Sequence, residues 1–171
     1  MRVTLHAPGY DSDRLHASLA RILTANALCS MATRTEAGTP HINTAYFCFS
    51  RDLVLYFLSH PGSVHCRNLT RVPQMAVAVF DSHQLWGDPH VGLQLLGTGM
   101  LTNPDAGYEV GELYAARFPR YREFLRRTPD EQPQSSTFGS LRFYCFSPER
   151  VQILDEWEFG EEVFISASIL R

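Results

Sequence analysis

The chain contains no lysine, and all fifteen of its basic residues are arginine. Chemistry that needs a lysine amine, such as a Schiff base to pyridoxal phosphate, is therefore excluded. A bound phosphate would have to be held by arginine, protonated histidine, hydroxyl groups or backbone N–H groups. The formal net charge is −3 and no basic run occurs. Nucleic-acid binding relies on clustered positive charge against phosphates, so it is not expected here.

Long apolar stretches and paired cysteines are also missing. No stretch approaches the ~20 apolar residues of a membrane span, and the N-terminus lacks the apolar core of a signal peptide. The cysteines lie far apart and form no CxxC pair: Cys29, Cys48, Cys66 and Cys145. We interpret them as reduced thiols of a cytoplasmic protein. The histidines show neither i, i+4 pairing on a helix nor the spacing of zinc ligands, so no metal site is expected.

The spacing of apolar residues predicts a helix and then closely spaced strands in the first half of the chain. The helix covers about 13–26, and its apolar face consists of Leu15, Leu19, Ile22 and Leu23. A short helix is expected after the turn at 61–62. Strands are predicted at 27–34, 39–49, 53–59, 75–81 and 91–101.

The second half of the chain is predicted to leave the strands for a helical insert at about 104–127. A Pro-, Gln- and Ser-rich loop at 128–139 precedes strands at 141–147 and 151–155, and the tail is a last strand or an arm. Short turns between strands favour antiparallel pairing. The 171 residues, 44% of them hydrophobic, are therefore predicted to form one mainly β domain over 1–171. Its expected architecture is a closed or nearly closed antiparallel β-barrel with peripheral helices.

One short segment places hydroxyl, imidazole and guanidinium groups together. Ser63, His65, Arg67 and Asn68 follow a turn within six positions and open a helix. A serine there can contact a phosphate, and it can equally serve as an ordinary helix cap. His65 can contact a ligand or lie on the helix surface, and the residues alone leave both interpretations open.

Five motifs, in order along the chain, resemble the FMN-binding split-barrel proteins related to pyridoxamine 5′-phosphate oxidase. They are A-T-x-x-x-x-G-x-P-H in a hairpin, L-Y-F-x-S before a turn, S-x-H-x-x-N-L opening a helix, P-x-x-A-V-A-V in a strand and G-L-Q-L-x-G in the next. The resemblance is strong over residues 15–102 and weak over the C-terminal strands. It implies a split β-barrel that forms a homodimer, with two FMN molecules at the subunit interface.

The same resemblance implies which residues contact the cofactor, although it identifies no catalytic residue. The strand with His41, Ile42, Asn43 and Thr44 would run beside the flavin ring. The phosphate would be held by Leu58, Ser59, Ser63, Val64 and His65. Gln94 would lie near the ring, on its own or on the partner's side. Some relatives bind the deazaflavin coenzyme F420 or haem in place of FMN.

The chain departs from the oxidase pattern at the phosphate site. Where the oxidase has Ser-Arg-Lys, this chain has Ser63-Val64-His65, and an imidazole with a pKa of ~6.5 carries only part of a positive charge near neutral pH. The substrate-handling C-terminal residues of the oxidase are not recognisable, so vitamin B6 oxidation is not carried over. Two functions remain: an FMN-dependent oxidoreductase acting on an unknown small molecule, and a non-catalytic module that binds or carries a flavin, a deazaflavin or haem.

Overall fold

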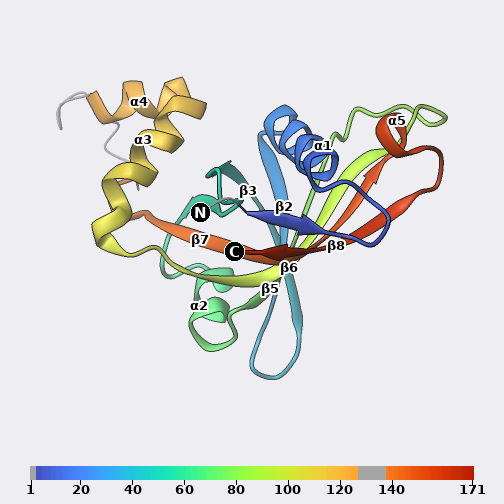
Figure 1. The fold of residues 1–171 in the computed structure, drawn as a ribbon. Helices are drawn as coiled ribbons and strands as arrows, with labels where there is room; N and C mark the ends of the chain where they lie inside the picture. The colour runs from blue at the N-terminus through green and yellow to red at the C-terminus, as the bar shows by residue number, and fades with distance from the viewer. Residues whose placement is uncertain (1–2, 127–137) are drawn as a thin grey trace.

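The structure is a computed structural model that describes residues 3–126 and 138–171. Figure 1 shows the barrel that its strands form and the helices that lie around it. In chain order they are β1 Thr4–His6, α1 Ser12–Ala25, β2 Leu28–Arg34, β3 Pro40–Phe49, β4 Leu55–Ser59, α2 Val64–Arg71, β5 Gln74–Phe80, β6 Val91–Leu101, α3 Gly107–Arg117, α4 Pro119–Arg126, β7 Arg142–Asp155, α5 Glu156–Phe159 and β8 Phe164–Leu170.

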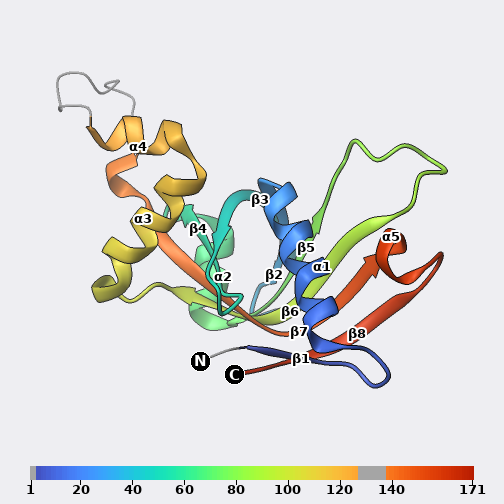
Figure 2. The same cartoon turned by 45° about the horizontal axis from the view of Figure 1, so that its top comes forward.

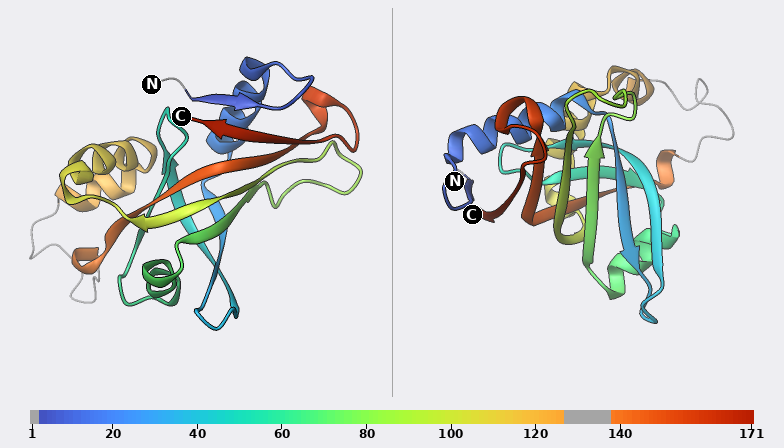
Figure 3. Two further views of the ribbon diagram at one scale, coloured as in Figure 1. Left: turned by 60° about the horizontal axis from the view of Figure 1, so that its bottom comes forward. Right: turned by 90° about the vertical axis from the view of Figure 1, so that its right-hand side faces the viewer.

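Six strands close into an antiparallel barrel. Around the ring the order is β2, β3, β4, β7, β6, β5, and β5 pairs again with β2. Outside this ring, β8 pairs with β7 and β1 pairs with β8, so the two ends of the chain lie side by side (Figure 3). The predicted antiparallel barrel with peripheral helices is confirmed, and the tail is a strand. The short strand β1 was not predicted.

Helix α1 packs its apolar face against the inner side of the sheet (Figure 2). The carboxylate of Asp11 caps the helix by accepting a hydrogen bond from the N–H of Arg14 at 2.9 Å. The buried carboxylate of Asp155, at the end of β7, accepts hydrogen bonds from Ser18 and Arg21. The four apolar residues predicted to face the core are all buried: Leu15, Leu19, Ile22 and Leu23.

The prediction of two separate strands at 141–147 and 151–155 was wrong, because β7 runs continuously from Arg142 to Asp155. Its first half pairs with β4 and its second half with β8, while β6 pairs along its whole length. Pro148 is accommodated at a bulge opposite Leu96 and Gly97, where the register with β6 shifts. A single bent strand therefore joins the closed barrel to the outer strands.

Gly97 is required at this bulge because β6 and β7 come unusually close there. A Cβ atom at this position would lie 2.7 Å from Cα of Pro148 and would clash with the carbonyl oxygen of Ser147. We expect Gly97→Ala to lower the free energy of unfolding by about 1–3 kcal/mol, the usual cost of overpacking. In the control, Gly111→Ala, the added Cβ has nothing within 4 Å, and helix propensity should raise stability by about 0.5–1 kcal/mol. Urea denaturation measures both, and an unaffected Gly97→Ala midpoint would contradict the close approach.

The helical insert packs on the outside of the barrel at one end, as Figures 1 and 2 show. Residues 107–117 and 119–126 are helical, a 3₁₀ turn at Pro104–Ala106 precedes them, and residue 127 lies outside the described residues. The predicted loop at 128–139 lies almost wholly outside them as well. Val110, Tyr114 and Ala115 are the buried residues of α3, whereas α4 has none. The insert thus has its buried residues in α3, while Tyr121 of α4 contacts Phe143 of β7 with 6.3 Å between ring centroids.

Candidate functional site

Three polar side chains at the start of α2 bond to one another, and we call Ser59, Ser63 and His65 the hydroxyl–imidazole cluster. Nε2 of His65 lies 2.7 Å from Oγ of Ser59 and 3.1 Å from Oγ of Ser63, and the two hydroxyl oxygens are 3.2 Å apart. The segment therefore brings together the hydroxyl and imidazole groups that the sequence suggested for a phosphate.

The cluster is neutral at neutral pH in the ligand-free chain. Burial lowers the pKa of His65 below its ordinary value of 6.5, because withdrawing the half-buried imidazole from water disfavours its charged form. The ring of His41 stacks parallel to that of His65, with 6.3 Å between ring centroids, and Phe57 packs at 6.2 Å. Protonation of His65 would therefore depend on a bound phosphate, whose negative charge stabilises the imidazolium.

The alternative of an ordinary serine cap is not what the structure shows. Ser63 occupies the N-cap position of α2, but its side chain makes no capping hydrogen bond. The two neighbouring polar residues have structural partners: Arg67 donates to the carbonyl of Gly62, and the buried amide of Asn68 donates to Oγ1 of Thr33 at 3.1 Å. Ser63 is therefore free of a capping role, and Arg67 and Asn68 stabilise the turn and its contact with β2.

A permanent cation that sequence reasoning missed lies opposite Ser59 on the neighbouring strand. Arg142, the first residue of β7, pairs directly opposite Ser59 in the β4–β7 ladder. Directly opposite residues share one face with Cβ atoms about 5 Å apart, so this guanidinium is within reach of the cluster. It now donates to the carbonyl oxygens of Gly139 and Leu141, at 3.1 and 2.8 Å. No local pattern reveals it, because the two strands are far apart along the chain.

Strand β3 divides its predicted cofactor residues between two faces of the sheet. His41 and Asn43 are half-buried on the inner face, while Ile42 and Thr44 are exposed on the outer face. Oδ1 of Asn43 is buried and has no hydrogen-bond partner among the described residues. The stretch from Pro40 to Tyr46 pairs with β2, and pairing with β4 begins only at Phe47. Its second edge therefore faces no described strand and offers backbone polar groups.

A cleft of about 860 Å³ lies between the outer face of β3 and β4 and the helical insert. We call it the insert cleft. Two residues that the sequence assigned to the cofactor, Thr44 and Leu58, line its sheet wall. Its opposite wall carries aromatic side chains of the insert: Tyr114, Phe118, Tyr121 and Phe124. The volume is within the range of ligand sites.

A second cavity adjoins the insert cleft, and neither cavity is lined by Ser59, Ser63 or His65. It has a volume of about 460 Å³ and shares Leu58, Tyr121, Phe124 and Leu141 with the insert cleft. It is also lined by Pro61, two residues before Ser63, and by Arg142. A ligand with a ring and a flexible anionic tail can therefore have its ring in the insert cleft and its tail toward Arg142.

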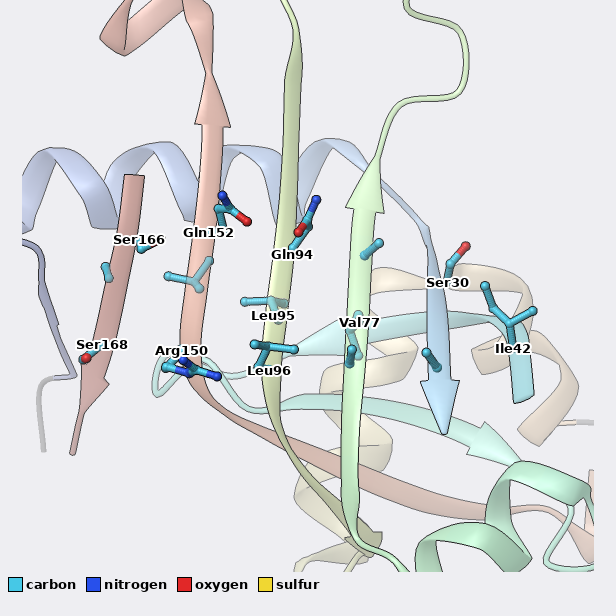
Figure 4. Close-up of a pocket in the computed structure, with 15 residues that line it drawn as sticks. Ser30, Ile42, Val77, Gln94, Leu95, Leu96, Arg150, Gln152, Ser166 and Ser168 are labelled. Atoms are coloured by element: carbon cyan, nitrogen blue, oxygen red, sulfur yellow. The ribbon is translucent and has the colours of Figure 1, made fainter. Parts of the chain in front are cut away.

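The outer face of the sheet from β8 to β3 is hollowed over small side chains, as Figure 4 shows. Its central row, read across the registered strands, is Ser166, Gln152, Gln94, Ala78, Ser30 and Thr44. The next row is Ser168, Arg150, Leu96, Ala76, Ala32 and Ile42. We call these two rows, with their large apolar neighbours Leu28, Tyr46, Phe80 and Phe164, the outer sheet face.

Gln94 does not lie near the other predicted cofactor residues of its own chain. It is exposed beside Gln152 on the outer sheet face (Figure 4). Three strand spacings, about 14 Å, separate Gln94 from Thr44.

Val64, another predicted phosphate contact, is exposed at 40%. The structure thus gathers Ser59, Ser63, His65 and His41 in one place, places Thr44 and Leu58 in the insert cleft, and leaves Ile42 and Gln94 on the outer sheet face.

The described lining of the insert cleft offers few side chains that could bind a metal ion. Haem needs an axial His, Cys, Met or Tyr ligand, and the described lining holds only tyrosines of this kind. Burial raises the pKa of Tyr114 and of Tyr121, so both phenols are protonated in the ligand-free chain. Among the described residues, no group of three His, Cys, Asp or Glu side chains could hold a metal ion.

None of the described helices is long and apolar enough to cross a membrane.

The closed barrel with extra strands and peripheral helices defines a split-barrel protein. A sequence model of the pyridoxamine 5′-phosphate oxidase family matches residues 15–155, so the chain belongs to that family. No curated protein matches the chain in sequence.

Solved structures with the same fold include proteins of different stated roles. HutZ, a haem storage protein of Vibrio cholerae, has a TM-score of 0.66 at 16% identity, covering 86% of this chain and 99% of that chain. A haem-binding protein from Mycobacterium smegmatis has a TM-score of 0.67 at 15% identity, covering 89% of this chain and 57% of that chain. A putative pyridoxamine 5′-phosphate oxidase from Listeria innocua has a TM-score of 0.58 at 16% identity, covering 82% of this chain and 98% of that chain. These likenesses establish the fold.

Proposed function

We propose that the chain binds FMN and is a flavin-dependent oxidoreductase acting on a small molecule. One observation carries the proposal: two cavities that share four lining residues lead from an aromatic cleft to Arg142, beside two hydroxyls and an imidazole. That arrangement suits a planar ring with a phosphate-bearing tail. When bound, FMN supplies hydride-transfer chemistry. The chain then needs only to orient the ring, hold the phosphate and limit the access of water.

The residues have distinct roles in this proposal. Ser59, Ser63 and His65 donate hydrogen bonds to the phosphate, and Arg142 supplies the permanent charge that the Ser-Val-His sequence lacks. The unpaired edge of β3 offers backbone N–H and carbonyl groups to the polar edge of the ring. Thr44 and Leu58 form the surface on which the ring lies. His41, stacked on His65, limits how far that imidazole can move.

We also propose that the functional unit is a homodimer formed through the outer sheet face. Several large apolar side chains are exposed there, among them Ile42 at 71%, Tyr46 at 56% and Phe80 at 52%. Large apolar side chains exposed on one face of a sheet commonly mark an interface between copies of a chain. A twofold partner could bring its Gln94 toward the ring.

Four free cysteines support a reducing, cytoplasmic location.

A non-catalytic binding or carrier module is the second candidate. It is favoured by the neutral cluster, because only one permanent cation faces the tail of the ligand. The ligand of such a module could be a flavin, the deazaflavin or haem, and two proteins of the same fold are described as binding or storing haem. The described lining of the insert cleft contains no histidine, cysteine or methionine, the other usual axial ligands of haem, and this argues against haem in that cleft.

Absorption spectroscopy followed by steady-state kinetics tests the proposal. Protein mixed with FMN and desalted should keep the visible absorption of a bound flavin, and it should then oxidise NAD(P)H or a reduced deazaflavin with a simple acceptor. Retained flavin without turnover would favour the carrier module. Colourless protein that does not quench added FMN would contradict flavin binding, and a Soret band after addition of haem would favour haem.

A further inference from the structure

The loop that joins β5 to β6, residues 81–90, presents apolar side chains to water at its tip, and we call it the Trp86 loop. Trp86 is fully exposed, and Leu85 is exposed at 69%. Figure 2 shows the loop extending past the ends of the two strands that it connects. Tryptophan is highly buried on average in folded proteins, so an indole left wholly in water suggests a contact with a second molecule.

Hydrogen bonds at its base hold the Trp86 loop in this position. The side-chain amide of Gln84 donates to the carbonyl oxygens of Asp81 and Val91, both at 2.9 Å, and its oxygen accepts from the N–H of Val91 at 2.7 Å. The N–H of His90 donates to the carboxylate of Glu156 at 2.6 Å. These contacts fix both ends of the loop, which reduces the ordering cost of any contact that its tip makes.

A pocket of about 320 Å³ lies at the base of the same loop and opens on the outer sheet face. Its lining includes the apolar side chains of Phe80, Leu154 and Phe164 together with the amides of Gln84 and Gln152. An indole combines an apolar ring with a single N–H donor, and a glutamine oxygen is an acceptor. The pocket therefore suits a tryptophan side chain, and its volume is near the lower end of the range of ligand sites.

The Trp86 loop and this pocket are neighbours in one chain, so a twofold axis can make them complementary. In an isologous dimer, a contact of one residue with another is repeated with the two copies exchanged. An axis that passes beside the loop can therefore place each Trp86 opposite the pocket of the other copy. Phe80, Phe164 and Gln152 of the pocket also belong to the outer sheet face, so the contact is continuous with the proposed interface.

We propose that two copies of the chain exchange their Trp86 loops, and that Trp86 of each copy is buried in the pocket of the other. The ring packs between Phe80 and Phe164, and the indole N–H donates to the amide oxygen of Gln152. The inference rests on the proposed homodimer and adds to it the residues that meet across the interface. It requires no cofactor, because every residue involved lies outside the insert cleft.

Light scattering over a dilution series measures the contribution of each side of this contact. Trp86→Ala should weaken the dimer by about 30-fold or more, as truncation of a buried tryptophan at an interface commonly does. Gly92→Leu should weaken it by a similar factor, because it fills the pocket from its floor; the added Cβ lies 3.4 Å from Cβ of Phe80, an ordinary contact. The matched control is Trp157→Ala, which removes a tryptophan exposed at 72% outside the pocket lining and should change nothing.

Mixing the two weakened variants tests the exchange itself. Neither homodimer has a native contact, since Trp86→Ala lacks the indole and Gly92→Leu lacks the open pocket. Their heterodimer retains one native contact, in which Trp86 of the second variant enters the open pocket of the first. Native mass spectrometry should therefore find heterodimers in clear excess over both homodimers. A statistical mixture would overturn the proposal.

Tryptophan fluorescence provides a readout that does not depend on a weakened dimer. In a Trp157→Phe background Trp86 is the sole tryptophan, because the chain has two. Its emission should shift to shorter wavelength, and its quenching by acrylamide should fall, as the concentration is raised and dimers form. An indole that stays equally accessible in the dimer would contradict the exchange.

The outcomes separate this inference from the proposed function. A dimer that is insensitive to Trp86→Ala and Gly92→Leu overturns the exchange alone, and the homodimer and the flavin site remain. A native protein that is monomeric at every concentration overturns the exchange and the homodimer together. Retention of FMN, measured on the same samples, decides the flavin proposal separately from either result.

Discussion

His65→Glu is expected to weaken FMN binding by at least about 100-fold, because like charges brought together cost several kcal/mol. The new carboxylate would stand where Nε2 of His65 now lies, 2.7 Å from Oγ of Ser59 and 3.1 Å from Oγ of Ser63. It would repel the phosphate and compete for both hydroxyl donors. Isothermal titration calorimetry with FMN measures the loss. Unchanged affinity would mean that the phosphate lies elsewhere.

The neutral variant His65→Gln is the matched control. Its amide keeps hydrogen-bonding capacity toward both serines, so we expect only a modest loss of affinity and no pH dependence from this position. In the native chain, burial lowers the pKa of His65 from 6.5. FMN affinity should therefore rise as the pH falls from about 8 to about 6.5, because the phosphate favours the protonated imidazole.

The same lowered pKa has the opposite effect on the ligand-free fold. The unfolded chain binds the proton of His65 more readily than the folded chain does, so stability increases with pH around this pKa. Stability from this group is present above pH 6.5 and is lost as the pH falls through the lower folded pKa. Bound FMN should reduce that loss, since the phosphate compensates the charge of the imidazole.

Ala76→Arg is expected to convert the dimer to a monomer. Ala76 lies in the second row of the outer sheet face, between Ala32 and Leu96 on the neighbouring strands. A guanidinium there would be buried without a partner against an identical copy, and burying an unpaired charge is strongly unfavourable. Light scattering should give about 19.4 kDa for the variant, the mass of one chain, and twice that for the native protein.

The control for this variant is Ala116→Arg, which adds the same charge on the exposed side of α3. It should leave the dimer intact. If the native protein is itself a 19.4 kDa particle, the shared site is wrong, and Gln94 cannot approach the ring from a partner. If Ala76→Arg remains dimeric, the copies associate through another face.

Most of the barrel was predictable because its signals are local. Alternating apolar residues and short turns located β2 to β6 to within two residues at either end, and helical spacing located α1. The prediction failed at β7, which was expected as two strands separated by a segment that contains Pro148. Whether a proline interrupts a strand depends on the partner strand, and here Gly97 of β6 allows the bulge. The sequence of β7 alone does not contain that information.

The candidate site was predictable only in part, for the same reason. Ser59, Ser63 and His65 lie within seven positions, so their proximity follows from one turn. Arg142 lies beside them only because β4 pairs with β7, and a contact between distant segments leaves no local pattern. The position of the insert depends in a similar way on a distant contact, because Arg117 joins α3 to the end of α1.

Comparing the affinities of FMN and riboflavin for the native protein tests the central claim most directly, since the two differ only in the phosphate. The account predicts that FMN binds about 10- to 100-fold more tightly, as expected for charge-assisted hydrogen bonds worth about 1.5–3 kcal/mol. Arg142→Ala should abolish most of that preference. Equal affinities for FMN and riboflavin, or a preference for FMN that Arg142→Ala leaves intact, would contradict it.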